Sequence, residues 1–155
     1  MIRKYEPSDL EDLLSVWAAA SAVAHPFLSS EFLRQERHNI PNVYLPNAET
    51  WVWEADGRVV GFIALVGNEV GAIFVDPAYQ RNGIGRALMD SARMVRDQLE
   101  LEVFKENALG RAFYARYGFE LVHEKIHEQT GREILRLRLA ANQPVRREGS
   151  DSSNM

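Results

Sequence analysis

The amino-acid sequence predicts one α/β (α+β) domain built around a single mixed sheet. Three observations support this prediction. The chain has 155 residues, which is the size of one domain. Runs of β-branched and aromatic residues alternate with segments that have the spacing of an amphipathic helix. Short turns join most neighbouring strands and make these pairs antiparallel, whereas a helical segment joins one pair and favours parallel pairing.

The first part of the chain predicts a short strand within residues 1–5, followed by two helices. The residues that recur at the spacing of one helix face are Leu10, Leu13, Leu14, Trp17 and Ser21. Because Pro26 disfavours the helical conformation in the residue before it, this helix is expected to end near Ala24. Ser29 offers a cap for a second helix, and a loop bounded by two prolines is expected at residues 41–46.

The middle of the chain predicts three adjacent antiparallel strands. The strands at residues 51–54 and 59–66 flank an Asp-Gly pair, which is a strong signal for a two-residue hairpin turn. A Gly-Asn pair then leads into a strand at residues 70–75. Turns this short connect only antiparallel neighbours.

The remaining chain predicts a helix, a strand, a second helix and two terminal strands. The first helix spans about residues 84–98, and it leads to a strand at 99–104. This helical crossover favours parallel pairing of that strand with the strand at 70–75. Asn107 is expected to cap a short helix that stops at Gly118. The two terminal strands are expected at residues 119–127 and 133–139.

Composition sets further limits on the protein. Residues 1–140 are predicted to form the domain, and the polar tail at 141–155 is expected to be disordered. With 18 basic and 22 acidic side chains, the net charge of −4 leaves no cationic surplus for binding nucleic acid. The absence of cysteine excludes disulfides and thiolate metal sites. Because no signal peptide or membrane-spanning stretch is found, we expect a cytoplasmic protein with neither nucleic acid nor a membrane as partner.

A glycine-bearing loop carries the first functional signal. A buried strand leads through Gly83 and Gly85 directly into an amphipathic helix. The first backbone amides of a helix have no internal partner and meet the positive end of the helix dipole, so such a loop can bind a phosphate or pyrophosphate. Arg81 and Arg86 bracket the loop and could add charge-assisted contacts. A structural alternative is that the glycines only shape a tight turn.

Two other nucleotide-binding motifs fit this loop less well. A phosphate-binding lysine motif is absent, because no Gly-Lys-Ser or Gly-Lys-Thr sequence occurs. A dinucleotide fingerprint needs a third small residue where Leu88 stands. Glu100 and Glu102 lie where a ribose-binding acid is expected, so nucleotide binding stays open as an alternative.

The loop at residues 80–85 resembles the acyl-CoA signature of the GCN5-related N-acetyltransferase (GNAT) family: Gln or Arg, two residues, Gly, one residue, then Gly or Ala. A second resemblance lies at residues 107–119, where Asn107, Phe113-Tyr114 and Gly118-Phe119 match another family segment. The interval between the two motifs fits one helix and one strand, and the resemblance extends over residues 1–139. Within the family the chain is most similar to small bacterial acetyltransferases, some of which acetylate protein lysines. That similarity is carried by residues 25–28, 44–48 and 51–54.

The resemblance implies a GNAT-like, mostly antiparallel sheet of six to seven strands, with helices on both faces and a splayed parallel strand pair. It also implies that acetyl-CoA is the co-substrate and lies where the strands at 70–75 and 99–104 separate. The backbone of Ile73, Phe74 and Val75 would hold the pantetheine and thioester like an added strand. The remaining cofactor-binding residues that it implies are Gln80, Arg81, Asn82, Gly83, Ile84, Gly85, Arg86, Asn107 and Tyr114.

Acetyl transfer to an amine needs a neutral amine and a proton for the leaving thiolate, and it needs no metal. Tyr114 is the predicted general acid, with a purely packed aromatic as the alternative. Glu69 is the provisional general base acting through water, although it could equally be an exposed charge beside a turn. His25 and Phe27 are predicted on the substrate side, where His25 could instead interact with the end of its helix. His123 and His127 are expected mainly on a strand surface.

Two further glycines have open interpretations. Gly71 is a plausible bulge position that would open the gap between the two parallel strands, or it simply ends a turn. Gly110 stands inside a helix, where glycine costs about 1 kcal/mol relative to alanine. Either the backbone there passes close to the cofactor, or this helix is locally weak.

Together these features predict an N-acetyltransferase that moves an acetyl group from acetyl-CoA directly to a primary amine of a protein lysine, an N-terminus or a small molecule. The alternatives are a non-catalytic module that binds CoA and a nucleotide-binding protein. The chain is expected to act as a monomer or homodimer without a metal.

Overall fold

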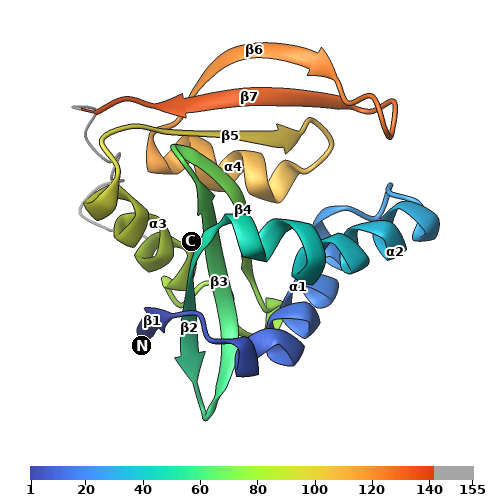
Figure 1. Ribbon diagram of the computed structural model, residues 1–155. Helices are drawn as coiled ribbons and strands as arrows, with labels where there is room; N and C mark the ends of the chain where they lie inside the picture. Colours follow the sequence, from blue (N-terminus) through green and yellow to red (C-terminus); the bar gives the residue numbers. More distant parts are fainter. Residues whose placement is uncertain (142–155) are drawn as a thin grey trace.

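A seven-stranded mixed sheet organises the chain, and the computed structural model describes residues 1–141 of it (Figure 1). Apart from Ala141, the predicted tail 141–155 lies outside the described residues. The strands are β1 (Ile2–Lys4), β2 (Glu49–Ala55), β3 (Arg58–Val66), β4 (Glu69–Val75), β5 (Leu99–Phe104), β6 (Glu120–Ile126) and β7 (Glu133–Leu139). Their spatial order is β1-β2-β3-β4-β5-β7-β6. Every neighbouring pair is antiparallel except β4 and β5, which confirms the predicted mixed sheet.

Helices cover both faces of the sheet, as predicted, because β3 points alternate side chains into two separate cores. The helices are α1 (Leu10–Ala24), α2 (Ser30–Asn39), α3 (Ile84–Val95) and α4 (Ala108–Tyr117). Val59 and Phe62 pack with Leu13 and other residues of α1 on one face. Val60 and Ile63 pack on the opposite face with side chains of α3 and α4. Neighbouring residues point to opposite faces because a strand has a two-residue period. A β-bulge at Val60 interrupts this period, which is why Val59 and Phe62, three residues apart, lie on the same face.

The boundaries of α1 and α2 agree with those predicted from the sequence, whereas the end of α3 does not. α1 ends at Ala24, before Pro26, and the Ser29 hydroxyl accepts from the Phe32 amide at 3.1 Å to begin α2. α3 ends at Val95 rather than near Gln98. Arg96 is extended there, and its guanidinium donates to the Gly67 carbonyl at 2.7 Å, so a tertiary contact ends this helix early.

The predicted loop at residues 41–46 is wrong, because this segment is helical. Residues Ile40–Tyr44 form a π-helical turn, and Leu45–Asn47 form a 3-10 turn directly after it. Each proline occupies one of the first two positions of its turn, where a missing N–H removes no helical hydrogen bond. Proline therefore starts these turns instead of preventing them.

α3 packs closely on the sheet because β3 carries a glycine under it. A Cβ atom on Gly61 would lie 3.2 Å from Ile84 Cγ2 and 3.3 Å from the Phe74 carbonyl oxygen. The carbonyl belongs to the neighbouring strand and cannot rotate away. This close approach fixes where α3 begins relative to β4.

We therefore expect Gly61→Ala to lower the free energy of unfolding by about 1–3 kcal/mol, through overpacking against α3 and β4. Gly71→Ala on β4 is the matched control, because its Cβ would meet only the Ala64 carbonyl at 3.7 Å, an ordinary contact. Urea unfolding followed by circular dichroism compares the two variants. Equal stability of both would contradict the packing argument.

Candidate active site

β4 and β5 separate from each other after a single paired position. Glu69 pairs with Glu100, and beside them the Glu100 amide donates to the Asn68 carbonyl at 2.9 Å. Along the other edge of β4, Val70 and Ala72 pair with β3 while Gly71 is skipped, which confirms the predicted bulge. Beyond the bulge, the edge of β4 that faces β5 has no strand partner within residues 1–141. Figure 1 shows β5 running at a steep angle to β4, so the predicted splayed pair is present.

Arg136 of β7 clamps the closed end of this gap. Its guanidinium donates to both oxygens of Glu69, at 2.6 and 3.0 Å, and to Oε1 of Glu100, at 2.7 and 2.9 Å. Without this cation two carboxylates on paired positions would repel each other. The hydrogen bond from Arg136 also lowers the pKa of Glu100. The carboxylate of Glu69 is thus committed to Arg136, and the geometry gives no support to its predicted role as the base.

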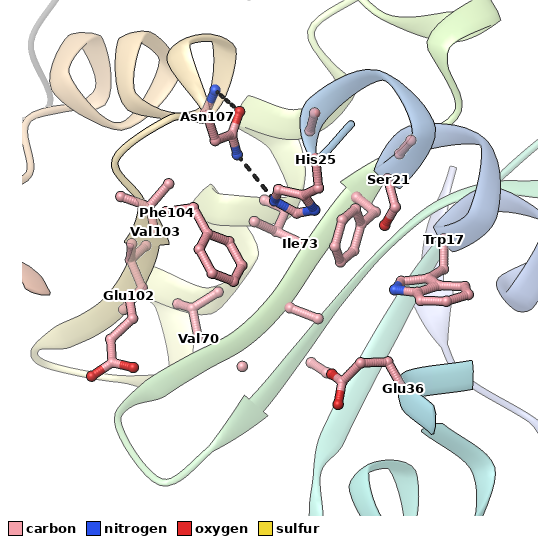
Figure 2. A pocket seen from close by; sticks show the side chains of 18 of the residues that line it. Trp17, Ser21, His25, Glu36, Val70, Ile73, Glu102, Val103, Phe104 and Asn107 are labelled. Carbon is pink, nitrogen blue, oxygen red and sulfur yellow. Dashed lines mark hydrogen bonds between the residues drawn. The ribbon is translucent and has the colours of Figure 1, made fainter. Parts of the chain in front are cut away.

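A cavity of about 690 Å³ extends from this gap to the helices α1 and α2 (Figure 2). Its size suits a small-molecule site. The predicted site residues that line it are His25, Ile73, Phe74, Val75, Gln80, Gly85, Asn107 and Tyr114. The predicted residues outside its lining are Phe27, Glu69, Arg81, Asn82, Gly83, Ile84 and Arg86. Phe27 instead packs edge-on against His25 and Phe104.

The start of α3 is open to a ligand. Gly83 precedes the helix with a φ of +77°, a left-handed conformation that favours glycine, and no side chain caps the first turn. A Cβ on Gly83 would meet nothing within 4 Å. Ile84 is buried and anchors the helix start in the core. This end of α3 therefore has the features of an anion site.

The polar residues around this loop already have contacts in the structure. The Gln80 side chain donates to the Val75 carbonyl at 3.2 Å. The Arg86 guanidinium lies 5.2 Å from the ring centroid of Tyr117 on α4. Arg81 is exposed and has a φ of +70°. Gln80 and Arg86 would each adjust these contacts when an anion binds.

Tyr114 lies on the wall of the cavity that α4 forms. Its ring packs edge-on against Phe113 and Phe119, at centroid distances of 5.5 and 5.7 Å. Burial raises the pKa of Tyr114 well above its ordinary value near 10, so the phenol stays protonated at neutral pH. This protonation state is the one that a general acid requires.

The side-chain amide of Asn107 makes two contacts, one with the start of α4 and one with His25 (Figure 2). The Oδ1 atom accepts from the Gly110 amide at 2.9 Å and caps α4, as predicted. This bond orients the Nδ2 group toward Nε2 of His25, 3.4 Å away, so the neutral imidazole accepts there and carries its proton on Nδ1. A Cβ on Gly110 would lie 2.5 Å from Asn107 Nδ2. An alanine at this position would therefore displace the Asn107 side chain from its present place.

Burial lowers the pKa of His25 to about 4. Aromatic rings surround the imidazole, with those of Phe27, Phe74 and Phe104 at centroid distances of 5.8, 6.3 and 5.3 Å. A protonated ring would also place an N–H against the donor group of Asn107. His25 is therefore a neutral side chain in the middle of the cavity.

The cavity lining also contains residues that the sequence analysis misses or assigns elsewhere. They are Trp17, Ser21, Glu36, Tyr44, Glu102 and His127. Trp17 and Ser21 were recognised only as part of a buried helix face, and His127 as a residue on a strand surface. Glu36 gives no signal in the sequence, and Tyr44 enters only through the resemblance of residues 44–48, because the contact between the two side chains depends on the unexpected π-helical turn.

Within residues 1–141 no group of His, Asp or Glu side chains has the arrangement of a metal site. No helix in that range is both long enough and apolar enough to span a bilayer.

The neutral state of His25 makes the stability of the protein depend on pH. As pH falls below about 6.5 the histidine takes up a proton in the unfolded chain, whereas in the folded protein it does so only near 4. The unfolded state then binds more protons, so this contribution is complete above pH 6.5 and is lost progressively toward pH 4. We expect His25→Asn to remove this dependence, which urea unfolding at pH 7 and pH 5 measures. The exposed His38 provides the control variant His38→Asn, and parallel profiles for wild type and His25→Asn would contradict the assignment.

Comparisons with known proteins agree with this geometry. The sequence model of the acetyltransferase (GNAT) domain matches residues 46–121. The peptidyl-lysine N-acetyltransferase YiaC of Escherichia coli K12 is 37% identical, over 79% of this chain and 84% of that protein. The peptidyl-lysine N-acetyltransferase YjaB of the same organism is 31% identical, over 90% of this chain and 95% of that protein.

Solved structures extend the comparison to the fold. The solution structure of apo-form YjaB from E. coli superposes with a TM-score of 0.79 at 27% identity, covering 89% of this chain and 95% of that one. The PaiA N-acetyltransferase of Thermoplasma acidophilum, solved with coenzyme A, gives 0.70 at 21% identity, covering 88% and 96%, and at that identity it shows the fold alone. Given the sequence identity to YiaC and the shared fold, the chain belongs to the GNAT family of acetyl-CoA-dependent N-acetyltransferases.

Proposed function

We propose that this protein transfers the acetyl group of acetyl-CoA directly to the side-chain amine of a lysine in a protein or peptide. The observation that carries the proposal is the continuous cavity that runs from the gap between β4 and β5 to the acceptor end between α1 and α2. Both substrates can enter such a cavity from opposite ends and meet within it. The naming of YiaC and YjaB as peptidyl-lysine N-acetyltransferases supports lysine as the acceptor.

In this proposal, acetyl-CoA lies along the unpaired edge of β4. The backbone of Ile73, Phe74 and Val75 would hydrogen-bond its pantetheine arm as a strand would. The pyrophosphate would lie at the open start of α3, near Gly83 and Gly85, where the helix dipole favours an anion. Residues 73–75 of β4 and Gly85 in the first turn of α3 line the same cavity, which supports this fit.

Asn107 is a proposed pantetheine contact, and both polar atoms of its side chain already have a partner in the structure. Its Oδ1 atom caps α4 and its Nδ2 group faces His25. A contact with pantetheine would therefore use the Nδ2 group and weaken its bond to His25. Binding of the cofactor and the position of His25 are coupled in this way.

The reaction joins the amine nitrogen to the thioester carbonyl carbon and then breaks the carbon–sulfur bond. The departing thiolate needs a proton, and Tyr114 is the proposed donor because its buried phenol is protonated and lines the cavity. The acetylated nitrogen then loses a proton, and this proton returns through solvent at the cavity mouth to restore the Tyr114 phenol. Atoms and charge balance over the turnover, with CoA leaving as the thiol.

The lysine amine must be neutral before it attacks. Its pKa in water is about 10.4, and burial in apolar surroundings lowers it. The aromatic rings of Phe74 and Phe104 and the neutral His25 provide such surroundings along the cavity. We propose that desolvation by this aromatic wall, rather than Glu69, supplies the neutral amine.

Replacement of Tyr114 by phenylalanine tests the proposed acid. Tyr114→Phe removes the proton donor but keeps the ring, so we expect kcat to fall by about 10²–10³-fold while KM for acetyl-CoA stays within about twofold. Release of free CoA thiol from acetyl-CoA with a lysine peptide gives both constants.

The matched control is Tyr117→Phe on the same helix, whose hydroxyl donates to Asp90 and does not line the cavity. An unchanged kcat for Tyr114→Phe would reject Tyr114 as the acid. Absence of thiol release with every amine, despite tight CoA binding, would reject the enzyme in favour of a CoA-binding module.

A further inference from the structure

We propose that Ser21 and Glu36 form an acceptor subsite that binds a second cationic group, separate from the amine that is acetylated. This inference rests on the proposed function and specifies which acceptors it favours. Both residues line the cavity at its acceptor end, Ser21 from α1 and Glu36 from α2, together with Trp17 (Figure 2).

Ser21 supplies the first observation. The residue is 3% exposed, and its hydroxyl finds no hydrogen-bond partner among the described residues. An unpaired buried hydroxyl is unfavourable for stability, so it requires an explanation. Ser21 borders the cavity, and its hydroxyl oxygen is covered in the structure, so a small rotation of this side chain toward the cavity would let a ligand group satisfy it.

Glu36 supplies the second, independent observation. Two carboxylates line the cavity, and one of them, Glu102, is paired with Lys125 at 2.9 Å and Arg136 at 3.4 Å. Glu36 has no cationic partner among the described residues. Within the described part of the chain, no lysine or arginine lines the cavity either. Glu36 is a partly exposed carboxylate on the cavity wall, and without a counter-charge it can bind a cation from outside the chain through a charge-assisted hydrogen bond.

The π-helical turn holds this carboxylate in place. The Tyr44 hydroxyl donates to Glu36 Oε2 at 2.8 Å, and the Asn39 amide donates in turn to the Tyr44 oxygen at 3.4 Å. The bond leaves Oε1 of Glu36 available to a ligand. Turns of this rare type occur frequently at functional sites. An oriented carboxylate binds a cation at a lower entropic cost than a mobile one.

Trp17 completes the subsite. It lies one helical turn from Ser21 on α1, and positions four residues apart share a helix face. An indole ring attracts a cation through its π face. The subsite therefore offers a hydroxyl oxygen, a carboxylate oxygen and an aromatic face, which together suit an ammonium or guanidinium group.

The favoured acceptor thus carries two cations, one that loses its proton and is acetylated and one that is held at Glu36. A lysine with a second basic residue nearby in a peptide has this chemistry, and so does a small diamine. We infer the peptide as the acceptor, in line with the proposed function, and the diamine is a separate arm of the test.

Steady-state acetylation of two matched peptides tests the subsite. The peptides share one reactive lysine, and the neighbouring position is arginine in one and its neutral isostere citrulline in the other. Wild type is expected to show a KM about tenfold lower for the arginine peptide, with similar kcat. Glu36→Gln is expected to abolish this preference and leave KM for acetyl-CoA unchanged. Glu31→Gln, an exposed carboxylate on the same helix outside the cavity, is the control.

Tyr44→Phe tests the orienting contact. Loss of the hydroxyl frees the Glu36 carboxylate to rotate, so KM for the arginine peptide is expected to rise about threefold. The KM for the citrulline peptide and kcat are expected to stay the same. A merely structural role for Tyr44 would change both peptides alike.

Ser21→Ala separates a ligand-binding hydroxyl from a structural one. Because the hydroxyl is unpaired, its removal is expected to keep or raise the melting temperature, while KM for the arginine peptide rises about threefold. Thr50→Val is the matched control: Thr50 is the other buried hydroxyl without a partner among the described residues, and it lies outside the cavity. A melting temperature that falls in Ser21→Ala with unchanged KM would overturn the role of Ser21.

Equal KM values of the wild type for the two peptides would overturn the subsite. If both peptides are still acetylated in that case, the proposed function remains supported. A diamine preferred over both peptides and over a monoamine of equal length, with the preference lost in Glu36→Gln, would support the subsite and assign it to small polyamines. No thiol release with any amine would reject the function and the subsite together.

Discussion

The single pairing between β4 and β5 is the constraint on which the whole site depends. A complete parallel ladder would use the backbone groups of Ile73–Val75 that acetyl-CoA is proposed to use. Two local features hold the strands together at one end only. Arg136 bridges Glu69 and Glu100 at the paired position, and the bulge at Gly71 redirects β4 immediately afterwards. On their other edges β4 pairs with β3 on both sides of the bulge and β5 pairs with β7 along its whole length, so both strands are held in the sheet although the gap is open.

The amide of Asn107 is the second feature that unites the site. Its oxygen accepts the hydrogen bond that caps α4, and its nitrogen contacts His25, 82 residues earlier in the chain. Through it the cofactor wall formed by α4 is linked to the acceptor wall formed by α1. Each hydrogen bond of this kind contributes about 0.5–1.5 kcal/mol, enough to position a side chain within a cavity. The same amide lies where a Cβ atom at position 110 would stand, and its donor group faces the imidazole that burial keeps neutral at position 25.

Much of the fold could be predicted from local signals. The Asp56-Gly57 turn has a positive φ at both residues, and the bulge at Gly71 and the crossover through α3 also lie where the sequence indicated. Features that depend on distant partners could not be predicted. Glu69 resembles an exposed turn residue until Arg136, 67 positions later, approaches it. The spacing of α1 predicted that Ser21 is buried, but not that its hydroxyl lacks a partner. The contact between Tyr44 and Glu36 forms across a helical turn with a proline at its start, where the sequence predicted a loop.

Amide-resolved hydrogen exchange, measured by NMR with and without coenzyme A, tests the central claim most directly. If the pantetheine arm pairs with the open edge of β4, exchange slows at one or more of the amides of Ile73, Phe74 and Val75, since alternate residues of a strand face each edge. Amides at the start of α3 slow as well, while those of β6 do not change. Unchanged exchange at β4 in the presence of saturating coenzyme A would contradict the account.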